Sequence, residues 1–157
     1  MNNFTISIFD NKIFFEIIRE IKLFSKFKIN YYEDLDLCVR VAERQNLLAI
    51  FFVNKKNINF FNNNKINNFP SILITEFSNS KSTFPSELRE HLNMPFSILE
   101  LEKKIISLVA KNEFKNNSLI RLNDYIINKN ERKIKKSDLE LRLSEKEINF
   151  LILFSKI

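Results

Sequence analysis

Residues 1–112 of this chain alternate between β-forming runs and stretches with the periodicity of an amphipathic helix. The run 47–53 (LLAIFFV) is apolar throughout, as expected for a strand that is buried on both faces. The expected strands lie at 4–9, 27–32, 47–53, 71–75 and 88–93. Strands that alternate with helices predict a parallel sheet with helices on both faces. We therefore expect an α/β fold of the flavodoxin-like (βα)5 type.

The first two helices are expected at 13–24 and 35–42, where apolar residues recur at helical spacing. Asp10 or Asn11 would cap the first of them. The Asn/Lys-rich segment 54–69 is compatible with a short helix or with an irregular loop. The first helix therefore begins where the first strand ends, at a polar residue.

A long helix is expected after the fifth strand. Ser97 and Glu100 form a capping box, and four apolar residues then share one side of the helix. They are Leu101, Ile105, Leu108 and Val109. The polar stretch 76–85 is expected to be loop, and 111–118 is the best candidate for a linker. We place the linker itself at 113–118, between a domain at 1–112 and a second one at 119–157.

Glycine is absent from the sequence. Phosphate-binding loops and dinucleotide fingerprints depend on glycine, so both kinds of site are excluded. Turns that need a positive φ are expected to use Asn or Asp instead. No nucleophile–base pair or cluster of metal ligands is visible, so we expect neither an enzyme nor a bound cofactor or metal.

The single cysteine and the single histidine limit the chemistry further. Cys38 has apolar neighbours and is expected to be a buried, inert thiol, with no disulfide possible within the chain. There is no basic segment before an apolar run at the N-terminus, and no apolar run of membrane-spanning length. We expect a cytoplasmic protein without a membrane partner. The net charge of +6 permits an anionic partner without requiring one.

The pattern changes after the linker. Four short strands separated by tight polar turns are expected at 119–122, 125–128, 132–135 and 139–143. Connections this short join antiparallel strands. Ser144 and Glu147 form a second capping box, and apolar residues continue a helix to the end of the sequence. A small antiparallel platform followed by a helix is therefore predicted.

Taken with these features, the chain resembles response regulators of the OmpR/PhoB type. Three stretches carry the resemblance: 6–18 with its acidic loop, 91–108 with its Met-Pro-Phe turn, and 119–154 with Leu-Ser-Glu-Lys-Glu at the helix start. The resemblance implies a receiver domain followed by the N-terminal part of a winged-helix DNA-binding domain. It also implies that the recognition helix and wing would lie beyond Ile157, so that DNA is a partner only with that additional part.

Departures from the family pattern fall on the phosphorylation pocket. The resemblance places this pocket at Asp10, Asn11, Asn54, Thr75 and Met94. Asn54 stands where a carboxylate would accept the phosphoryl group, and an amide cannot form an acyl phosphate. The acidic pair that would hold Mg²⁺ is reduced to Asp10, and Met94 replaces the usual Lys. The sequence predicts a degenerate receiver that does not take phosphate.

Several of these residues have a simpler interpretation. Asp10 is better explained as a helix N-cap than as a metal ligand, and Thr75 as a strand-end hydrogen-bonding residue as readily as a switch. The possible contacts to the DNA backbone are Lys133, Lys135, Lys136 and Arg142. A solvated face is the simpler explanation of these four residues.

We expect a phosphorylation-independent transcriptional regulator whose receiver-like domain acts as a dimerisation module. The family pairs receivers through a face that corresponds here to parts of 87–112. The possible dimer face comprises Leu88, Leu101, Ile105 and Leu108. The alternative is a protein-interaction module, or an anti-regulator that pairs with an intact homologue, with no DNA binding of its own.

Overall fold

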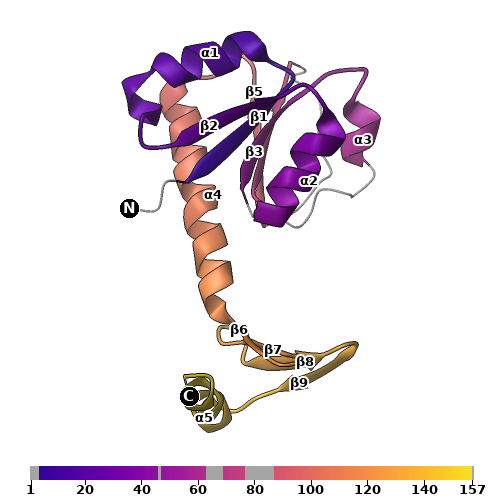
Figure 1. The fold of residues 1–157 in the computed structure, drawn as a ribbon, viewed down its shortest axis with the longest axis vertical. Helices are drawn as coiled ribbons and strands as arrows, with labels where there is room; N and C mark the ends of the chain where they lie inside the picture. The colour runs from indigo at the N-terminus through magenta and orange to yellow at the C-terminus, as the bar shows by residue number, and fades with distance from the viewer. Residues whose placement is uncertain (1–3, 46, 63–68, 77–86, 157) are drawn as a thin grey trace. The chain divides into compact units, whose positions relative to one another are not determined.

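The computed structural model describes residues 4–45, 47–62, 69–76 and 87–156. The chain divides into two compact units, 1–112 and 113–157. We call them the α/β unit and the platform unit (Figure 1).

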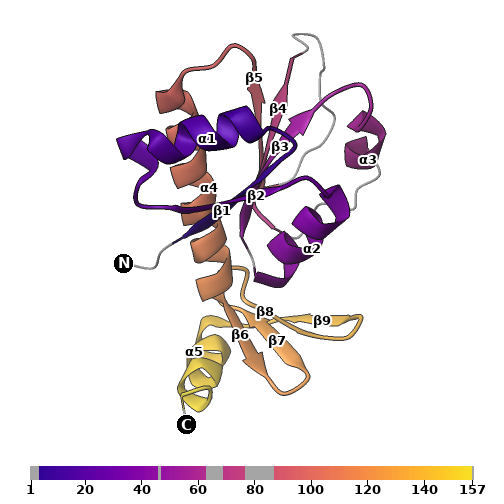
Figure 2. The ribbon, with the colours of Figure 1, turned by 45° about the horizontal axis from the view of Figure 1, so that its top comes forward.

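The α/β unit is built on a parallel sheet (Figure 2). The sheet has five strands in the order β2-β1-β3-β4-β5. Its strands are β1 (Thr5–Phe9), β2 (Lys28–Tyr32), β3 (Leu48–Val53), β4 (Ser71–Thr75) and β5 (Arg89–Asn93). This strand order is the flavodoxin-like one. The predicted fold class and the five predicted strands are confirmed, with boundaries that shift by one residue at four of them.

Helices cover both faces of this sheet (Figure 1). They are α1 (Lys12–Glu20), α2 (Leu35–Gln45), α3 (Ile58–Asn62) and α4 (Ile98–Ser118). The first and last of them lie against one face, and α2 and α3 lie against the other.

The central strand β3 contributes to a separate apolar core on each face. Side chains alternate between the two faces of a strand. Ile50 belongs to one core, together with Ile18 of α1 and Leu101 of α4. Phe51, the next residue, points the opposite way and packs with Cys38 of α2. The sheet thus separates two apolar cores.

The platform unit contains a four-stranded antiparallel sheet with the order β6-β7-β8-β9, followed by one helix. Its elements are β6 (Leu119–Leu122), β7 (Tyr125–Asn128), β8 (Lys133–Lys136), β9 (Leu139–Arg142) and α5 (Glu145–Phe154). Ser144 caps α5, and the Ser144 N–H donates in return to the Glu147 carboxylate. The predicted platform and capping box are confirmed.

Positive φ angles mark the tight turns of a chain without glycine. Asp10 (62°) and Asn123 (51°) are of the expected types. Arg132 (53°) and Ser137 (51°) are not, although both also take the left-handed conformation. Side chains of these types have a Cβ that disfavours this conformation, so the short turns of the platform impose it.

Some predicted boundaries were wrong. The first helix ends at Glu20, and Lys22–Phe24 form a separate 3₁₀ turn. Residues 58–62 adopt the short-helix alternative, whereas 63–68 and 77–86 lie outside the described residues. The predicted linker at 113–118 is helical and continues α4, because the segment contains no Pro or Gly that would end a helix. The division into two domains otherwise stays a prediction.

Candidate functional site

Three of the predicted pocket residues follow or end neighbouring strands at the same edge of the parallel sheet. Asp10 follows β1, Asn54 follows β3, and Thr75 ends β4. Val53 lies opposite Thr75 in the register. Ligands of open parallel sheets bind beyond the carboxyl ends of the strands, so this edge is the candidate functional site.

Asp10 does not cap α1. The cap is Asn11, whose Oδ1 accepts a hydrogen bond from the Phe14 N–H at 2.9 Å. Asp10 precedes the cap at a φ of 62°, is exposed, and donates its N–H to the Tyr32 carbonyl at 3.2 Å. Of the two predicted caps, Asn11 is confirmed, and the interpretation of Asp10 as an N-cap was wrong. The Asn11 side-chain oxygen therefore forms its hydrogen bond with the first turn of α1.

Asn54 is held in a reciprocal network with Asn57. The Asn54 Oδ1 accepts hydrogen bonds from the N–H groups of Lys56 (2.8 Å) and Asn57 (3.1 Å). The Asn57 Oδ1 accepts the Asn54 N–H at 2.8 Å, and the Asn57 Nδ2 donates to the Phe52 carbonyl at 2.9 Å. Both side chains therefore serve the turn that leads from β3 into α3.

Thr75 has a defined partner as well. Its hydroxyl donates to the Asn93 Oδ1 at 2.8 Å, which ties the end of β4 to the end of β5. The Met94 N–H donates to the Thr75 carbonyl at 2.9 Å, and a cis peptide bond joins Met94 to Pro95. The Met94 side chain offers no charge to an anion. Of the two interpretations of Thr75, these contacts match the strand-end hydrogen-bonding residue.

The chemistry available at this edge is limited. Asp10 is the one carboxylate among the predicted pocket residues, and Mg²⁺ prefers several oxygen ligands. Among the described residues, no group of three or more His, Cys, Asp or Glu side chains could hold a metal ion. The amides of Asn11 and Asn54 are occupied by backbone groups.

The two residue types most often used for nucleophilic and acid–base chemistry lie elsewhere. Burial raises the pKa of the Cys38 thiol to about 12, so the thiol remains protonated at neutral pH. Burial, followed by the nearby Arg89, lowers the pKa of His91. The prediction that Cys38 is buried is confirmed.

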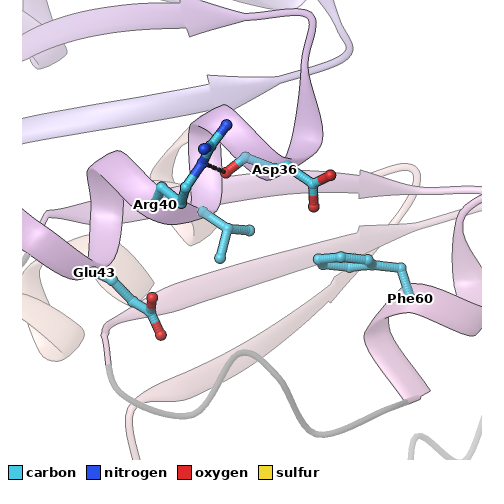
Figure 3. Close-up of a pocket in the computed structure, with 5 residues that line it drawn as sticks. Asp36, Arg40, Glu43 and Phe60 are labelled. Carbon is cyan, nitrogen blue, oxygen red and sulfur yellow. Dashed lines mark hydrogen bonds between the residues drawn. The ribbon is translucent and has the colours of Figure 1, made fainter.

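A separate hollow of about 460 Å³ lies beside α2 and α3 (Figure 3). It is lined by Asp36, Val39, Arg40, Glu43 and Phe60. The Arg40 Nε donates to the Asp36 carbonyl at 3.3 Å. None of the predicted pocket residues lines this hollow.

The predicted dimer face was wrong in its residues. Leu88, Leu101, Ile105 and Leu108 are all buried. The last three belong to the core cluster on one face of the sheet, so they are unavailable to a second molecule. Other side chains of α4 are exposed, among them Leu99 and Ile106. The apolar spacing that suggested a dimer face marks the side of α4 that packs on its own sheet.

The platform sheet separates the predicted DNA contacts between its two faces. Residues directly opposite one another in a sheet share a face. Lys133 lies opposite Arg142, and Lys135 lies opposite Glu140 and Ile126. Since alternate residues of a strand share a face, Lys133, Lys135 and Arg142 are on one side, which we call the basic face. Lys136 lies on the other side, with its Nζ 4.7 Å from the Tyr125 ring centroid.

Arg121 was missed by the sequence analysis. It lies opposite Ile126, which is itself opposite Lys135, so Arg121 also belongs to the basic face. The two-residue alternation in LIRL could have indicated this. Within the described residues, Arg121, Lys135 and Arg142 form no salt bridge.

Lys133 is paired within the sheet. Its Nζ lies 2.7 Å from the Glu140 Oε1 and 3.6 Å from the Glu131 Oε2. The hydrogen bond from Lys133 to Glu140 raises the pKa of the lysine and lowers the pKa of the carboxyl group. Among the described residues of this face, Arg121, Lys135 and Arg142 are therefore the cations that could bind an anion without first breaking a salt bridge.

No family model matches the sequence, and no curated protein does. Among solved structures, the chain is similar to the response regulator DrrB, an OmpR/PhoB homologue from Thermotoga maritima. The match is 14% identical, covers 97% of this chain and 72% of that one, and has a TM-score of 0.40. In the described part of this chain, no helix is long and apolar enough to cross a membrane.

Proposed function

We propose that this chain is a phosphorylation-independent regulator of the response-regulator type. In this proposal the α/β unit is an interaction module and the platform unit contacts DNA. The chain performs no catalysis of its own. The observation that carries the proposal is the pair of hydrogen bonds that the Asn54 side chain accepts from backbone N–H groups of the following turn. The resemblance to response regulators assigns this position to a phosphoryl acceptor, and an amide cannot form an acyl phosphate.

Further support for phosphorylation independence comes from the rest of the same edge. The Thr75 hydroxyl is bound to Asn93, and Met94 supplies no cation for a phosphoryl oxygen. A site that accepts phosphate would need a carboxylate, a metal and a counter-charge. Here the Asn54 amide and the Thr75 hydroxyl form hydrogen bonds with neighbouring groups at the strand ends instead.

Support for a DNA contact comes from the basic face of the platform sheet. Arg121, Lys135 and Arg142 lie on one side of the sheet without a salt-bridge partner among the described residues. Arginine and lysine side chains bind phosphates without reading bases. We expect backbone contacts from this face, and base readout would need additional elements.

A salt series of DNA binding tests this proposal. Fluorescence anisotropy of a labelled duplex should show binding at low salt that weakens as salt is added. The double variant Lys135→Ala/Arg142→Ala should bind more weakly, with a log–log salt slope shallower by about two, one per lost phosphate contact. Lys136→Ala is the matched control, because Lys136 lies on the opposite face, and it should leave the slope unchanged.

The same experiment separates the second candidate function. Leu139, Leu141, Phe150 and Leu153 are exposed on the platform unit, which favours a protein-interaction module without DNA binding. That alternative predicts no DNA affinity at low salt. Equal losses from the Lys136 variant and the double variant would also contradict the proposed face.

Pairing of two α/β units is part of the proposal. Because the four side chains of the predicted dimer face are buried, pairing would use exposed residues of α4 such as Leu99 and Ile106. These two residues are seven positions apart and so share one side of the helix, where a second copy could cover both.

A further inference from the structure

β9 is an edge strand of the platform sheet. All four of its residues are exposed, with Leu139 at 77% and Leu141 at 69%. The outer side of an edge strand presents backbone N–H and C=O groups that another strand could pair with. Natural edge strands are usually protected, so an exposed one with two large apolar residues indicates an interaction surface.

The direction of the free backbone groups follows from the ladder. The Leu143 N–H donates to the Arg132 carbonyl at 2.7 Å, and the register then places Arg142 opposite Lys133. Hydrogen-bonded pairs alternate with non-hydrogen-bonded pairs in an antiparallel ladder. Leu141 therefore bonds toward β8, whereas the backbone groups of Glu140 and Arg142 point toward the open edge.

Leu141 lies at the centre of the sequence Leu-Glu-Leu-Arg-Leu (139–143), with an acidic residue on one side and a basic residue on the other. In an antiparallel pair centred on Leu141, Glu140 lies opposite Arg142 of a second copy, and the reverse pair forms as well. The residues whose backbone points outward are thus also those of opposite charge. Centring the pair on Glu140 or on Arg142 would place like charges opposite each other.

Charge within the protomer favours the same pairing. Arg142 lies directly opposite Lys133, a pair of like charges, while Lys133 already binds Glu140. We propose that two copies of this chain pair antiparallel through β9, centred on Leu141. Each Arg142 then gains a carboxylate neighbour from the other copy, and both platform sheets join into one. This interface rests on the open edge of β9 and not on DNA binding, although Arg142 also belongs to the basic face.

Hydrogen exchange measures this interface in the unmodified chain. The Glu140 and Arg142 amides should become more protected as the protein concentration rises, because pairing buries them in backbone hydrogen bonds. The Arg121 amide is the control: the Lys129 N–H donates to the Ser118 carbonyl, so Arg121 points outward from the opposite edge, β6. Free exchange at Glu140 and Arg142 at every concentration would overturn the proposal.

A cysteine variant gives an independent readout. Leu141→Cys should form a covalent dimer under mild oxidation, because the two copies of position 141 lie directly opposite each other. Cys38 is buried and should not interfere. Arg121→Cys on the other edge is the matched control. Equal cross-linking of the two variants would show random collision and contradict the proposal.

Charge reversal tests the register. Glu140→Arg should weaken self-association about tenfold, because it places like charges opposite each other twice in each dimer. The double variant Glu140→Arg/Arg142→Glu restores opposite charges between the copies and opposite Lys133, and should recover the association. The arginine at position 140 lies opposite Lys135 in both variants, so this contact does not distinguish them. Failure of the double variant to recover, in a protein that remains folded, would rule out this register.

Discussion

The Asn54 side chain has a structural role in the turn that follows β3. Its side chain accepts two backbone hydrogen bonds, and the Asn57 side chain accepts one from the Asn54 N–H. An amide is as good an acceptor as a carboxylate for such a turn. The position therefore has a local structural role that requires no phosphate chemistry.

Substitution of Asn54 should separate its hydrogen bonding from its charge. Asn54→Ala removes the acceptor of two backbone N–H groups and should lower the free energy of unfolding by about 1 kcal/mol. Asn54→Asp keeps the acceptor and should change stability much less. Urea denaturation followed by circular dichroism measures both, and equal losses for the two variants would contradict the assigned role.

At the residue scale, the sequence predicted positions better than roles. The helix after β1 was expected, but the sequence offered both Asp10 and Asn11 as its cap. The choice depends on the backbone conformation of these residues. Asp10 takes a left-handed φ of 62°, and Asn11 is the residue that caps the helix. The apolar residues of α4 were correctly placed on one side of the helix. Their assignment to a dimer was wrong because periodicity does not distinguish a core from an interface.

At the scale of elements, β5 and α4 are joined by ion pairs around one carboxylate. The Glu90 carboxylate lies 3.2 Å from the Lys104 Nζ and 3.1 Å from the Lys111 Nζ. Burial raises the pKa of Glu90, but hydrogen bonds from Lys111 and Lys104 outweigh it, so the pKa is lowered overall. The ionised carboxylate therefore stabilises the folded state.

Glu90→Gln should lower the free energy of unfolding by about 1 kcal/mol at neutral pH. A group with a lowered folded-state pKa stabilises the fold above its unfolded value, 4.5, and this contribution is lost as the pH falls through the folded-state value. The difference between the variant and the wild type should therefore shrink below pH 4.5. Glu16→Gln, on the exposed side of α1, is the control. A difference that does not depend on pH would contradict the ion-pair explanation.

The sequence predicted the helices and strands more accurately than it predicted the roles of single residues. Continuous apolar strands and short alternating ones are distinct patterns, and both sheets followed from them. The helical state of 113–118 was missed because a polar composition was taken for a loop, although nothing in it ends a helix. The same alternation that predicted β8 also places Lys136 away from Lys135.

At the scale of the whole molecule, the chain combines a flavodoxin-like unit with a platform unit that buries little of its apolar surface. Among the described residues of the platform unit, the buried apolar side chains are Ile127 and Ile148. A unit of this size gains little stability from so small a core. Interaction through β9 and contact through the basic face would each give this unit a partner.

Treatment with acetyl phosphate and Mg²⁺, followed by intact mass spectrometry, tests the central claim most directly. A receiver that works through a phosphoryl acceptor gains one phosphoryl group under these conditions. We expect no phosphoryl adduct, because Asn54 cannot form an acyl phosphate and Asp10 is the one pocket carboxylate. A stoichiometric adduct on a carboxylate at the strand ends of the α/β unit would contradict the account.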